Sequence, residues 1–224
     1  MNKEDAMLTV LTVATSSEKA VPFMRSCYGR GVYPAILGIG CHYPFNGVKI
    51  HYIRQALEAI KGVVVYADAY DCTLVNDIEQ MERQFLASGK DVIFAAEKNC
   101  YPDAELAPAY SSAPTDYRFL NSGCFIGHSD KVKAVLDDIK WDEHNSDQLL
   151  ITQYFLKNRD KITLDYHCEF FHCMFMAELD LTYGDRIKNH VTDTEPFIIH
   201  GNGHSDMTRV NEWAESKTNL LLKN

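Results

Sequence analysis

Long hydrophobic runs are absent from this sequence of 224 residues. The longest uninterrupted apolar stretches are short, such as residues 62–67, and fall far below the ~20 residues that a membrane-spanning helix requires. Positive charge is also scarce, because 22 lysines and arginines face 31 aspartates and glutamates, which gives a net charge of −9. An acidic chain repels nucleic acid. We therefore expect no nucleic acid and no membrane among its partners.

Closely spaced cysteine pairs are missing as well. The seven cysteines are an odd number and are widely spread, unlike the ligands of a zinc ribbon or a secreted disulfide framework. The first eight residues carry acids where a secretory signal has a basic region. We therefore expect reduced thiols and a location in the cytoplasm or another reducing compartment.

Short apolar runs alternate with amphipathic segments along the chain. Strands are expected at residues 8–14, 35–39, 62–68, 91–96, 119–126 and 197–200. Helices are expected from the Ser16–Ser17 cap to residue 28, at residues 48–60, 76–88, 129–139 and 147–156, and from about residue 206. This alternation predicts an α/β fold with a mostly parallel central sheet flanked by helices. Because linkers and repeats are lacking, we expect one domain over residues 1–224.

Two acidic residues follow the apolar strand at residues 62–68. Asp68 and Asp71 are three positions apart, at the carboxyl end of a strand where α/β sheets bind ligands. Two converging carboxylates suit a hard divalent cation such as Mg²⁺ or Mn²⁺. The alternative is that one aspartate caps the turn while the other lies in solvent.

A histidine ends the last predicted strand. His200 is followed by Gly201, Asn202 and Gly203, and glycines let the backbone approach a ligand closely. The alternative is an ordinary core histidine before a glycine turn.

The segment Asn121-Ser122-Gly123 interrupts an apolar strand, which is unfavourable unless the backbone must bend or approach a ligand. Asp147 and Gln148 start a later helix and offer the side chains that a sugar's hydroxyl groups require. A bulge together with an acid in the first turn of the helix explains the same residues without a ligand.

Two other patterns are weaker. His128 and Asp130, with His200 downstream, imitate an iron site of two histidines and one carboxylate, but that site needs a β-barrel. The segment at residues 167–173 holds two histidines and two cysteines, yet its spacing matches no zinc module. Neither pattern predicts a metal site here.

Six motifs follow one another over nearly the whole chain. They are residues 10–15, 68–71, 94–102, 118–127, 146–149 and 200–203. In this order and spacing they resemble the glycosyltransferase domain of the procollagen lysyl hydroxylases. The broader group of retaining GT-A transferases shares this arrangement of motifs. The resemblance implies a GT-A-like, nucleotide-sugar-binding fold and a Mn²⁺-dependent enzyme that uses a UDP-sugar. In that family the enzyme glucosylates galactosyl-hydroxylysine of collagen and works in the endoplasmic reticulum.

The resemblance also implies roles for single residues. It places metal ligands at Asp68, Asp71 and His200. It places contacts to the donor nucleotide and sugar at Val13, Thr15, Lys49, Tyr70, Asn121, Ser122, Gly123 and Gly203. Tyr101 falls where the family has a tryptophan that gates the sugar, and Asn202 where it has a functional asparagine. Asp147, Gln148 and Asn202 would surround the charge that develops on the sugar.

Two positions depart from the family pattern. A run of aspartates before the family's Asp-Gln pair is reduced here to Asp147 alone, after Glu143-His-Asn-Ser146. A lysine after the second glycine is replaced by Asp206, which would repel a diphosphate, so we expect Asp206 to turn toward solvent. Lys49, or more weakly Arg209, would then supply the missing cation.

The sequence thus predicts a single GT-A-like domain that transfers glucose from UDP-glucose to galactosyl-hydroxylysine of collagen, with Mn²⁺ and with retention at the anomeric carbon. One alternative is galactose transfer from UDP-galactose to hydroxylysine. Another is a module that binds a UDP-sugar or glycan without turnover, which the Asp206 departure favours.

Overall fold

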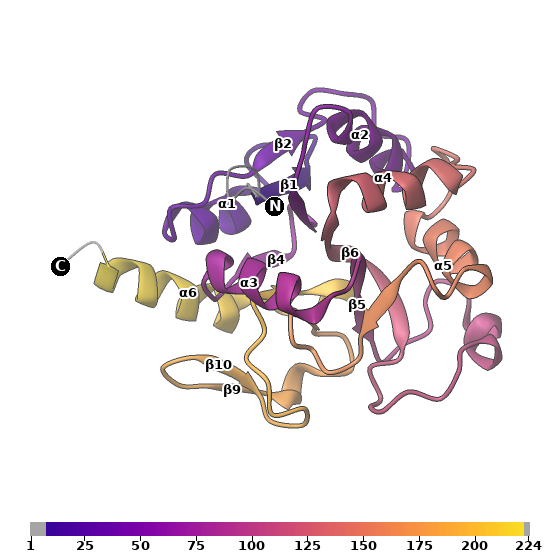
Figure 1. Ribbon diagram of the computed structural model, residues 1–224. Helices are drawn as coiled ribbons and strands as arrows, with labels where there is room; N and C mark the ends of the chain where they lie inside the picture. The colour runs from indigo at the N-terminus through magenta and orange to yellow at the C-terminus, as the bar shows by residue number, and fades with distance from the viewer. Residues whose placement is uncertain (1–7, 222–224) are drawn as a thin grey trace.

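A central sheet of six strands, in the order β2-β1-β3-β6-β5-β7, organises the molecule (Figure 1). The computed structural model describes residues 8–221, so most of the acidic N-terminal segment, which is unlike a secretory signal, lies outside the described residues. The strands are β1 (Thr9–Val13), β2 (Ala35–Leu37), β3 (Val63–Ala67), β5 (Val92–Glu97), β6 (Phe119–His128) and β7 (Thr163–Asp165).

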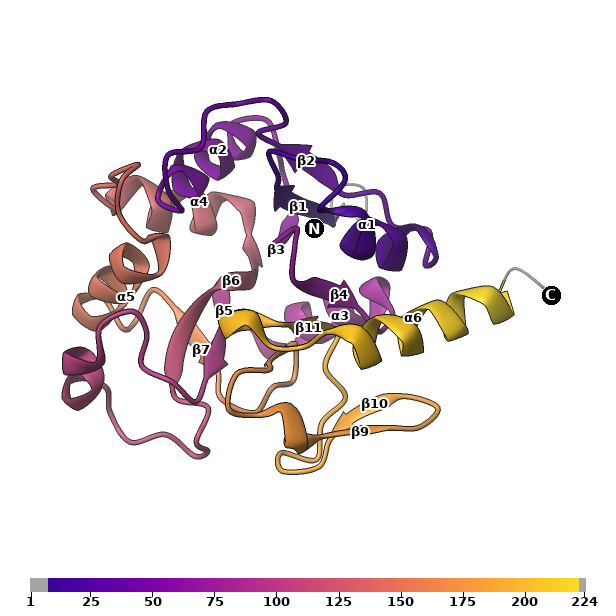
Figure 2. The ribbon, with the colours of Figure 1, turned by 180° about the vertical axis from the view of Figure 1, so that it is seen from behind.

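Helices cover both faces of this sheet, as the view from behind also shows (Figure 2). They are α1 (Val21–Tyr28), α2 (Val48–Leu57), α3 (Ile78–Ser88), α4 (Ser129–Asp138) and α5 (Asp147–Lys157), whereas α6 (Thr208–Leu221) lies elsewhere, against α1 and the second sheet. Alternate residues of each strand point to opposite faces. Val64 therefore packs with α2, α4 and α5, whereas its neighbours Val63 and Val65 pack with α1 and α3. None of the described helices has the length and apolar character to cross a bilayer.

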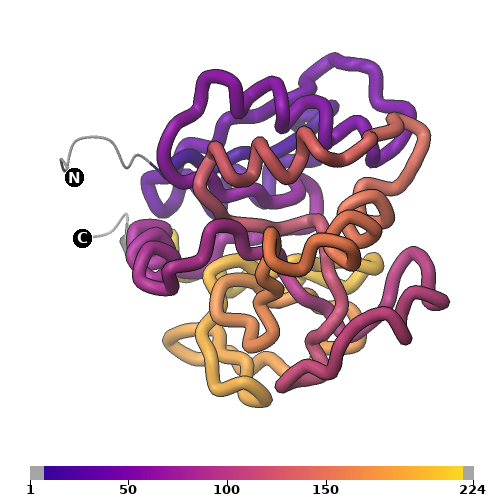
Figure 3. Tube along the Cα trace, turned by 45° about the vertical axis from the view of Figure 1, so that its right-hand side comes forward, coloured from indigo at the N-terminus to yellow at the C-terminus, as the bar shows by residue number. Residues whose placement is uncertain are grey.

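The sheet is mixed, because five of its six strands run in one direction, as a mostly parallel sheet requires, and β6 runs in the other. β6 runs antiparallel to both β3 and β5, while the other neighbouring pairs are parallel. The sequence does not reveal this reversal because β6 is buried on both faces, like a strand of a parallel sheet. The connection from β5 to β6 contains a 3₁₀ helix, Ala104–Ala109, in the magenta loop at the lower right of Figure 3.

A second sheet has the strand order β4-β11-β8, and two of its strands, β4 and β11, are labelled in Figure 2. Its strands are β4 (Cys72–Leu74), β8 (Phe171–Cys173) and β11 (Ile198–His200), and a separate hairpin pairs β9 (Leu181–Tyr183) with β10 (Ile187–Asn189). Of these strands only β11 follows from the sequence, because three-residue strands show too little periodicity to be recognised.

The ends of several elements differ from the sequence expectation. α1 begins at Val21 rather than at the Ser16–Ser17 cap, because Pro22 occupies its first turn, and Ala20 provides no side-chain cap. α3 does begin beside a capping residue, since Asp77 accepts a hydrogen bond from the Gln80 amide.

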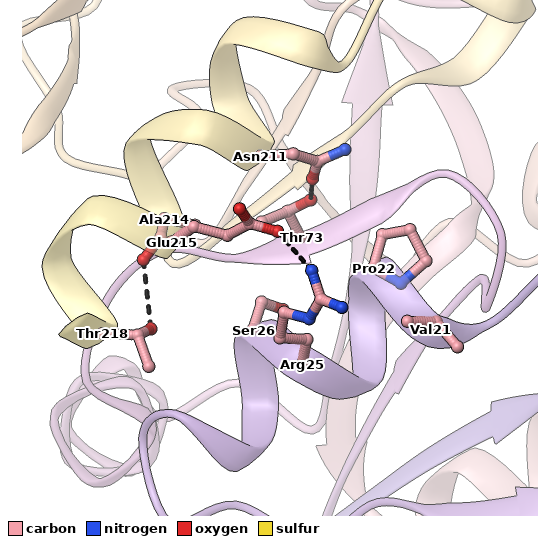
Figure 4. A pocket seen from close by; sticks show the side chains of 9 residues that line it. All are labelled: Val21, Pro22, Arg25, Ser26, Thr73, Asn211, Ala214, Glu215 and Thr218. Carbon is pink, nitrogen blue, oxygen red and sulfur yellow. Dashed lines mark hydrogen bonds and ion pairs between the residues drawn. The ribbon is translucent and has the colours of Figure 1, made fainter. Parts of the chain in front are cut away.

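α6 lies against α1 and the edge of β4 (Figure 4). Thr73 Oγ1 donates to Asn211 Oδ1 at 2.6 Å, and Arg25 Nη1 pairs with Glu215 Oε1 at 2.6 Å. Because the Arg25 and Glu215 side chains are 60% and 50% exposed, this ion pair contributes little stability. The buried side chains of the helix, such as Val210, therefore hold it in place.

Asp165, at the end of β7, fixes the turn that leads to β8. Its buried carboxylate accepts hydrogen bonds from the backbone amides of Glu169, Phe170 and Phe171 at 2.8–2.9 Å. Without this carboxylate the buried amides of Phe170 and Phe171 would lack a hydrogen-bond partner.

We expect Asp165→Ala to lower the free energy of unfolding by about 2–4 kcal/mol, since it removes an acceptor shared by three amides. Asp160→Ala, on the exposed loop nearby, is the matched control and should change stability by less than about 0.5 kcal/mol. Denaturant unfolding of both variants is the measurement. Equal stability of Asp165→Ala and the unchanged protein would contradict this account.

Candidate functional site

A cleft of about 470 Å³ opens where β3 and β11 end and where β6 is interrupted. Most of the residues predicted from the sequence line it, namely Lys49, Asp68, Asp71, Tyr101, Asn121, Ser122, Gly123, Asp147, Gln148, His200, Asn202 and Gly203. They come from segments far apart in the chain, so the fold brings them together rather than their sequence spacing.

Asp68, Asp71 and His200 form a group that can hold a metal ion. One ligand atom from each lies within 4.8 Å of the others, and His200 Nε2 is 3.4 Å from Asp71 Oδ2. Burial by itself would raise the pKa of Asp71, but the neighbouring His200, together with Lys49 and a backbone hydrogen bond, outweighs burial and lowers that pKa. Two carboxylates and one imidazole are a donor set that suits Mn²⁺. The residues present therefore fit the divalent ion that the sequence pattern implies.

Asn121 sets the orientation of the His200 ring. Its Nδ2 donates to Glu97, so its Oδ1 faces His200 Nδ1 at 3.0 Å. This arrangement places a ring proton on Nδ1 and makes Nε2 the nitrogen that faces the aspartates. Gly123 is required beside the ring, because a Cβ atom there would lie 2.2 Å from His200 Cε1.

Lys49, near the start of α2, is buried between two acids. Its Nζ lies 3.0 Å from Asp68 Oδ1 and 2.8 Å from Asp147 Oδ2. Burial alone would lower the pKa of Lys49, but Asp147 and Asp68 outweigh it and raise that pKa well above its usual range. Tyr66 also donates to Asp68 Oδ1, at 2.6 Å. Lys49 is therefore charged and held in place. Burial raises the pKa of Asp68, although the neighbouring Lys49 opposes this shift.

Glu97 lies at the centre of the cleft but was not among the site residues predicted from the sequence. Its carboxylate accepts hydrogen bonds from the side-chain amides of Asn121, Gln148 and Asn202 at 2.8–2.9 Å. Burial raises the pKa of Glu97, although these hydrogen bonds oppose the shift. An acid at the end of an apolar strand was the signal that could have identified it. Tyr66, which holds Asp68, gave no such signal because its pattern is that of a core residue.

The interruption of β6 is both a bulge and part of the cleft. The register against β5 shifts from Phe94↔Phe125 to Ala95↔Asn121, so the intervening residues of β6 have no partner on β5. Ser122 Oγ in this bulge donates to Asp147 Oδ2 at 3.0 Å. Ser146 caps α5, and Asp147 lies in its first turn with its carboxylate toward Lys49. Asn121, Ser122 and Asp147 therefore form a bulge and a first helical turn, and they also line the cleft, so the two interpretations of these residues are compatible.

Val13, Thr15 and Tyr70 are not among the residues that line the cleft. The Tyr70 hydroxyl accepts hydrogen bonds from the backbone amides of Thr15 and Ser16 at 2.9 and 3.0 Å, which joins the end of β1 to the turn after β3. Val13 is buried in β1. Their assignment to the uridine stays a prediction.

Tyr101 lies at the rim of the cleft. Its side chain is 59% exposed, and its carbonyl accepts a hydrogen bond from Gln148 Nε2 at 2.9 Å. An exposed ring in this place can approach a ligand without moving the backbone.

Asp206 turns toward solvent, as expected, and accepts a hydrogen bond from the Thr208 amide at the start of α6. Arg209 packs over the Tyr183 ring, 4.1 Å from its centroid. Among the cleft-lining residues of the described chain, Lys49 is the single lysine or arginine.

The two weaker metal patterns are not assembled within residues 8–221. The groups of histidine, cysteine and acidic residues close enough to share an ion are Asp68-Asp71-His200 and Cys72-Cys124-His200. His128 packs against Phe85 instead, and Phe170 and Phe171 of the 167–173 segment belong to the core.

Comparison with known proteins identifies the family. The family model described as "PLOD GT domain" matches residues 4–217. The chain is 33% identical over 219 residues to uncharacterized protein R699 of Acanthamoeba polyphaga mimivirus, covering 90% of this chain and 47% of that protein.

Two animal relatives match over a similar stretch. Procollagen-lysine,2-oxoglutarate 5-dioxygenase 1 of Bos taurus is 31% identical over 221 residues, covering 90% of this chain and 30% of that protein. Multifunctional procollagen lysine hydroxylase and glycosyltransferase LH3 of Rattus norvegicus is 29% identical over 218 residues, covering 88% and 29%. The chain spans less than half the length of these relatives. It belongs to the PLOD glycosyltransferase-domain family, and this membership implies a GT-A-like fold.

Proposed function

We propose that this domain transfers glucose from UDP-glucose to galactosyl-hydroxylysine in a collagen-like polypeptide, with Mn²⁺ and with retention at the anomeric carbon. The observation that carries the proposal is the cleft. There the Asp68-Asp71-His200 group lies beside Glu97 and the three side-chain amides that donate hydrogen bonds to it, those of Asn121, Gln148 and Asn202. The printed name of the rat relative, which includes procollagen and glycosyltransferase, supports the class of acceptor.

The charge of the cleft suits a metal-bound diphosphate. Four acids, Asp68, Asp71, Glu97 and Asp147, line it against the single lysine Lys49. Asp68, Asp71 and His200 would hold Mn²⁺, which when bound supplies Lewis-acid stabilisation of the departing diphosphate. Lys49 lies beside the same aspartate and adds a fixed positive charge near the leaving group.

The sugar would lie against the amides on the other side of the cleft. Gln148 and Asn202 are held by Glu97, so their orientation is set before a ligand binds. Asp147, held by Lys49 and Ser122, would face the positive charge that develops on the sugar ring. Departure of the diphosphate on the face that the acceptor attacks is compatible with retention.

The acceptor and the donor sugar are tested by measuring UDP release with a panel of UDP-sugars, with and without a galactosylated collagen peptide. We expect release only with UDP-glucose and that peptide. Release with UDP-galactose on unglycosylated hydroxylysine would favour the galactosyltransferase alternative. UDP binding without release for any sugar would favour a binding module.

Asp71→Asn should abolish turnover and weaken Mn²⁺ binding, because it removes the charge of one ligand while keeping its size. Free Mn²⁺ measured by electron paramagnetic resonance reports binding independently of turnover. Asp185→Asn, which changes an exposed acid in the β9–β10 hairpin, should leave both properties unchanged. Full activity of the unchanged protein in excess EDTA would refute the metal requirement.

Glu97→Gln should lower turnover more than it weakens UDP binding. A glutamine NH₂ in this place would face either the Asn202 Nδ2 or the amides of Asn121 and Gln148, so a donor would meet a donor. Asn202 cannot simply flip, because its Oδ1 accepts a hydrogen bond from the Phe175 amide. We expect kcat to fall at least about ten-fold, a cost of about 1.4 kcal/mol.

The control for this variant is Glu105→Gln, on the exposed 3₁₀ helix. Calorimetric UDP titration and steady-state kinetics separate the two effects. If Glu97→Gln loses UDP affinity and retains turnover at saturation, the amides have been assigned to the wrong part of the donor.

A further inference from the structure

Behind the predicted metal ligands lies a second group of metal-binding side chains. Cys72, Cys124 and His200 each offer a ligand atom within 4.8 Å of the others, and all three residues are buried. Cys72 Sγ is 3.5 Å from Cys124 Sγ. None of the proposed steps of glycosyl transfer uses these thiols.

The register of the second sheet brings a third thiol to this group. In β11 His200 pairs with Cys72 of β4 on one side and with Cys173 of β8 on the other. Side chains of paired residues project from the same face of a sheet. Cys173 Sγ accordingly lies 4.0 Å from His200 Nδ1, and Cys124 of β6 approaches from the facing sheet.

The spacing of the thiols suits a shared metal. Two sulfurs bound to one tetrahedral Zn²⁺ at ≈ 2.3 Å lie about 3.8 Å apart. The observed separation of 3.5 Å is close to this value, whereas a disulfide requires about 2.05 Å. All seven cysteines are free thiols in the structure, so no disulfide uses these ligands.

We propose that Cys72, Cys124 and His200 bind a thiophilic divalent cation such as Zn²⁺ or Cd²⁺, and that this cation excludes Mn²⁺ from the adjoining site. The part concerning Mn²⁺ rests on the proposed function; the thiol site itself does not.

The charge balance favours burial of such an ion. A divalent cation with two thiolates and a neutral imidazole has no net charge, so its burial among the core residues around Cys72 and Cys124 avoids the cost of an isolated charge. Binding displaces the two thiol protons to solvent.

Exclusion follows from the chemistry of one imidazole. A neutral histidine has one nitrogen lone pair, and its other nitrogen carries a proton. Mn²⁺ bound at Asp68, Asp71 and His200 would use the Nε2 lone pair, while Nδ1–H donates a hydrogen bond to Asn121 Oδ1. A thiophilic ion that binds His200 either takes that lone pair or shifts the proton to Nε2, and in both cases the aspartates lose their third ligand.

The test is a Cd²⁺ titration of the fully reduced protein, followed by the ultraviolet charge-transfer absorbance of cadmium thiolates. We expect one Cd²⁺ per chain, and free Mn²⁺ measured by paramagnetic resonance should rise as Cd²⁺ binds. The double variant Cys41→Ser/Cys100→Ser, which removes the two cysteines outside the buried set, should retain the full absorbance and keeps the core intact.

Cys72→Ala and Cys124→Ala should each lose most of the absorbance, whereas Cys27→Ala, at a buried cysteine outside the group, should keep it. Absence of the absorbance in the unchanged protein, or its loss in the double variant, would overturn the site. Cadmium–thiolate absorbance without release of Mn²⁺ would overturn the exclusion. Because neither readout requires turnover, failure of the glycosyltransferase proposal would leave this test valid.

Discussion

The contact of the Lys49 ammonium with Asp68 and Asp147 is the interaction on which the cleft depends. It joins α2, the end of β3 and the start of α5, three segments far apart in the sequence. Removing three charged groups from water costs several kcal/mol per ion, and apolar residues of similar size would often be at least as stable. The ion pairs are therefore better explained by what they hold in position than by the stability they add.

Glu97 plays the corresponding role on the other side of the cleft. One carboxylate orients three amide side chains from β6, α5 and the segment after β11. Through Asn121 it also fixes the His200 ring, so the same acid connects the amides with the metal-ligand group. The cleft thus consists of two linked polar networks rather than a series of independent side chains.

The sequence predicted the elements that are long and periodic, and it predicted the residues that stand at strand ends. Asp68, Asp71 and His200 were recognisable because they stand at or just after the carboxyl ends of apolar strands, where α/β sheets bind ligands. The direction of β6 and the strands β4, β7 and β8 were not, because a buried antiparallel strand resembles a parallel one and three residues show no period. Nor could any pattern show that Lys49 lies between two acids or that Glu97 bonds three amides, since these contacts exist only after the sheets pack.

The position of His200 explains why the hard and soft ligand sets lie so close together. It is the last residue of the central strand of a three-stranded sheet, where its ring lies against Gly123 of the facing strand. On the cleft side of the ring lie the carboxylates of Asp68 and Asp71, which are in loops. On the core side lie the thiols of Cys72 and Cys124, which are in strands. A strand end is where carboxylate and thiol ligands can meet one imidazole, because Asp71 directly precedes β4 and faces the cleft, whereas Cys72 is the first residue of β4 and lies in the core. Which metal ion His200 binds therefore depends on whether its ring ligates together with the carboxylates of the cleft or with the thiols of the core.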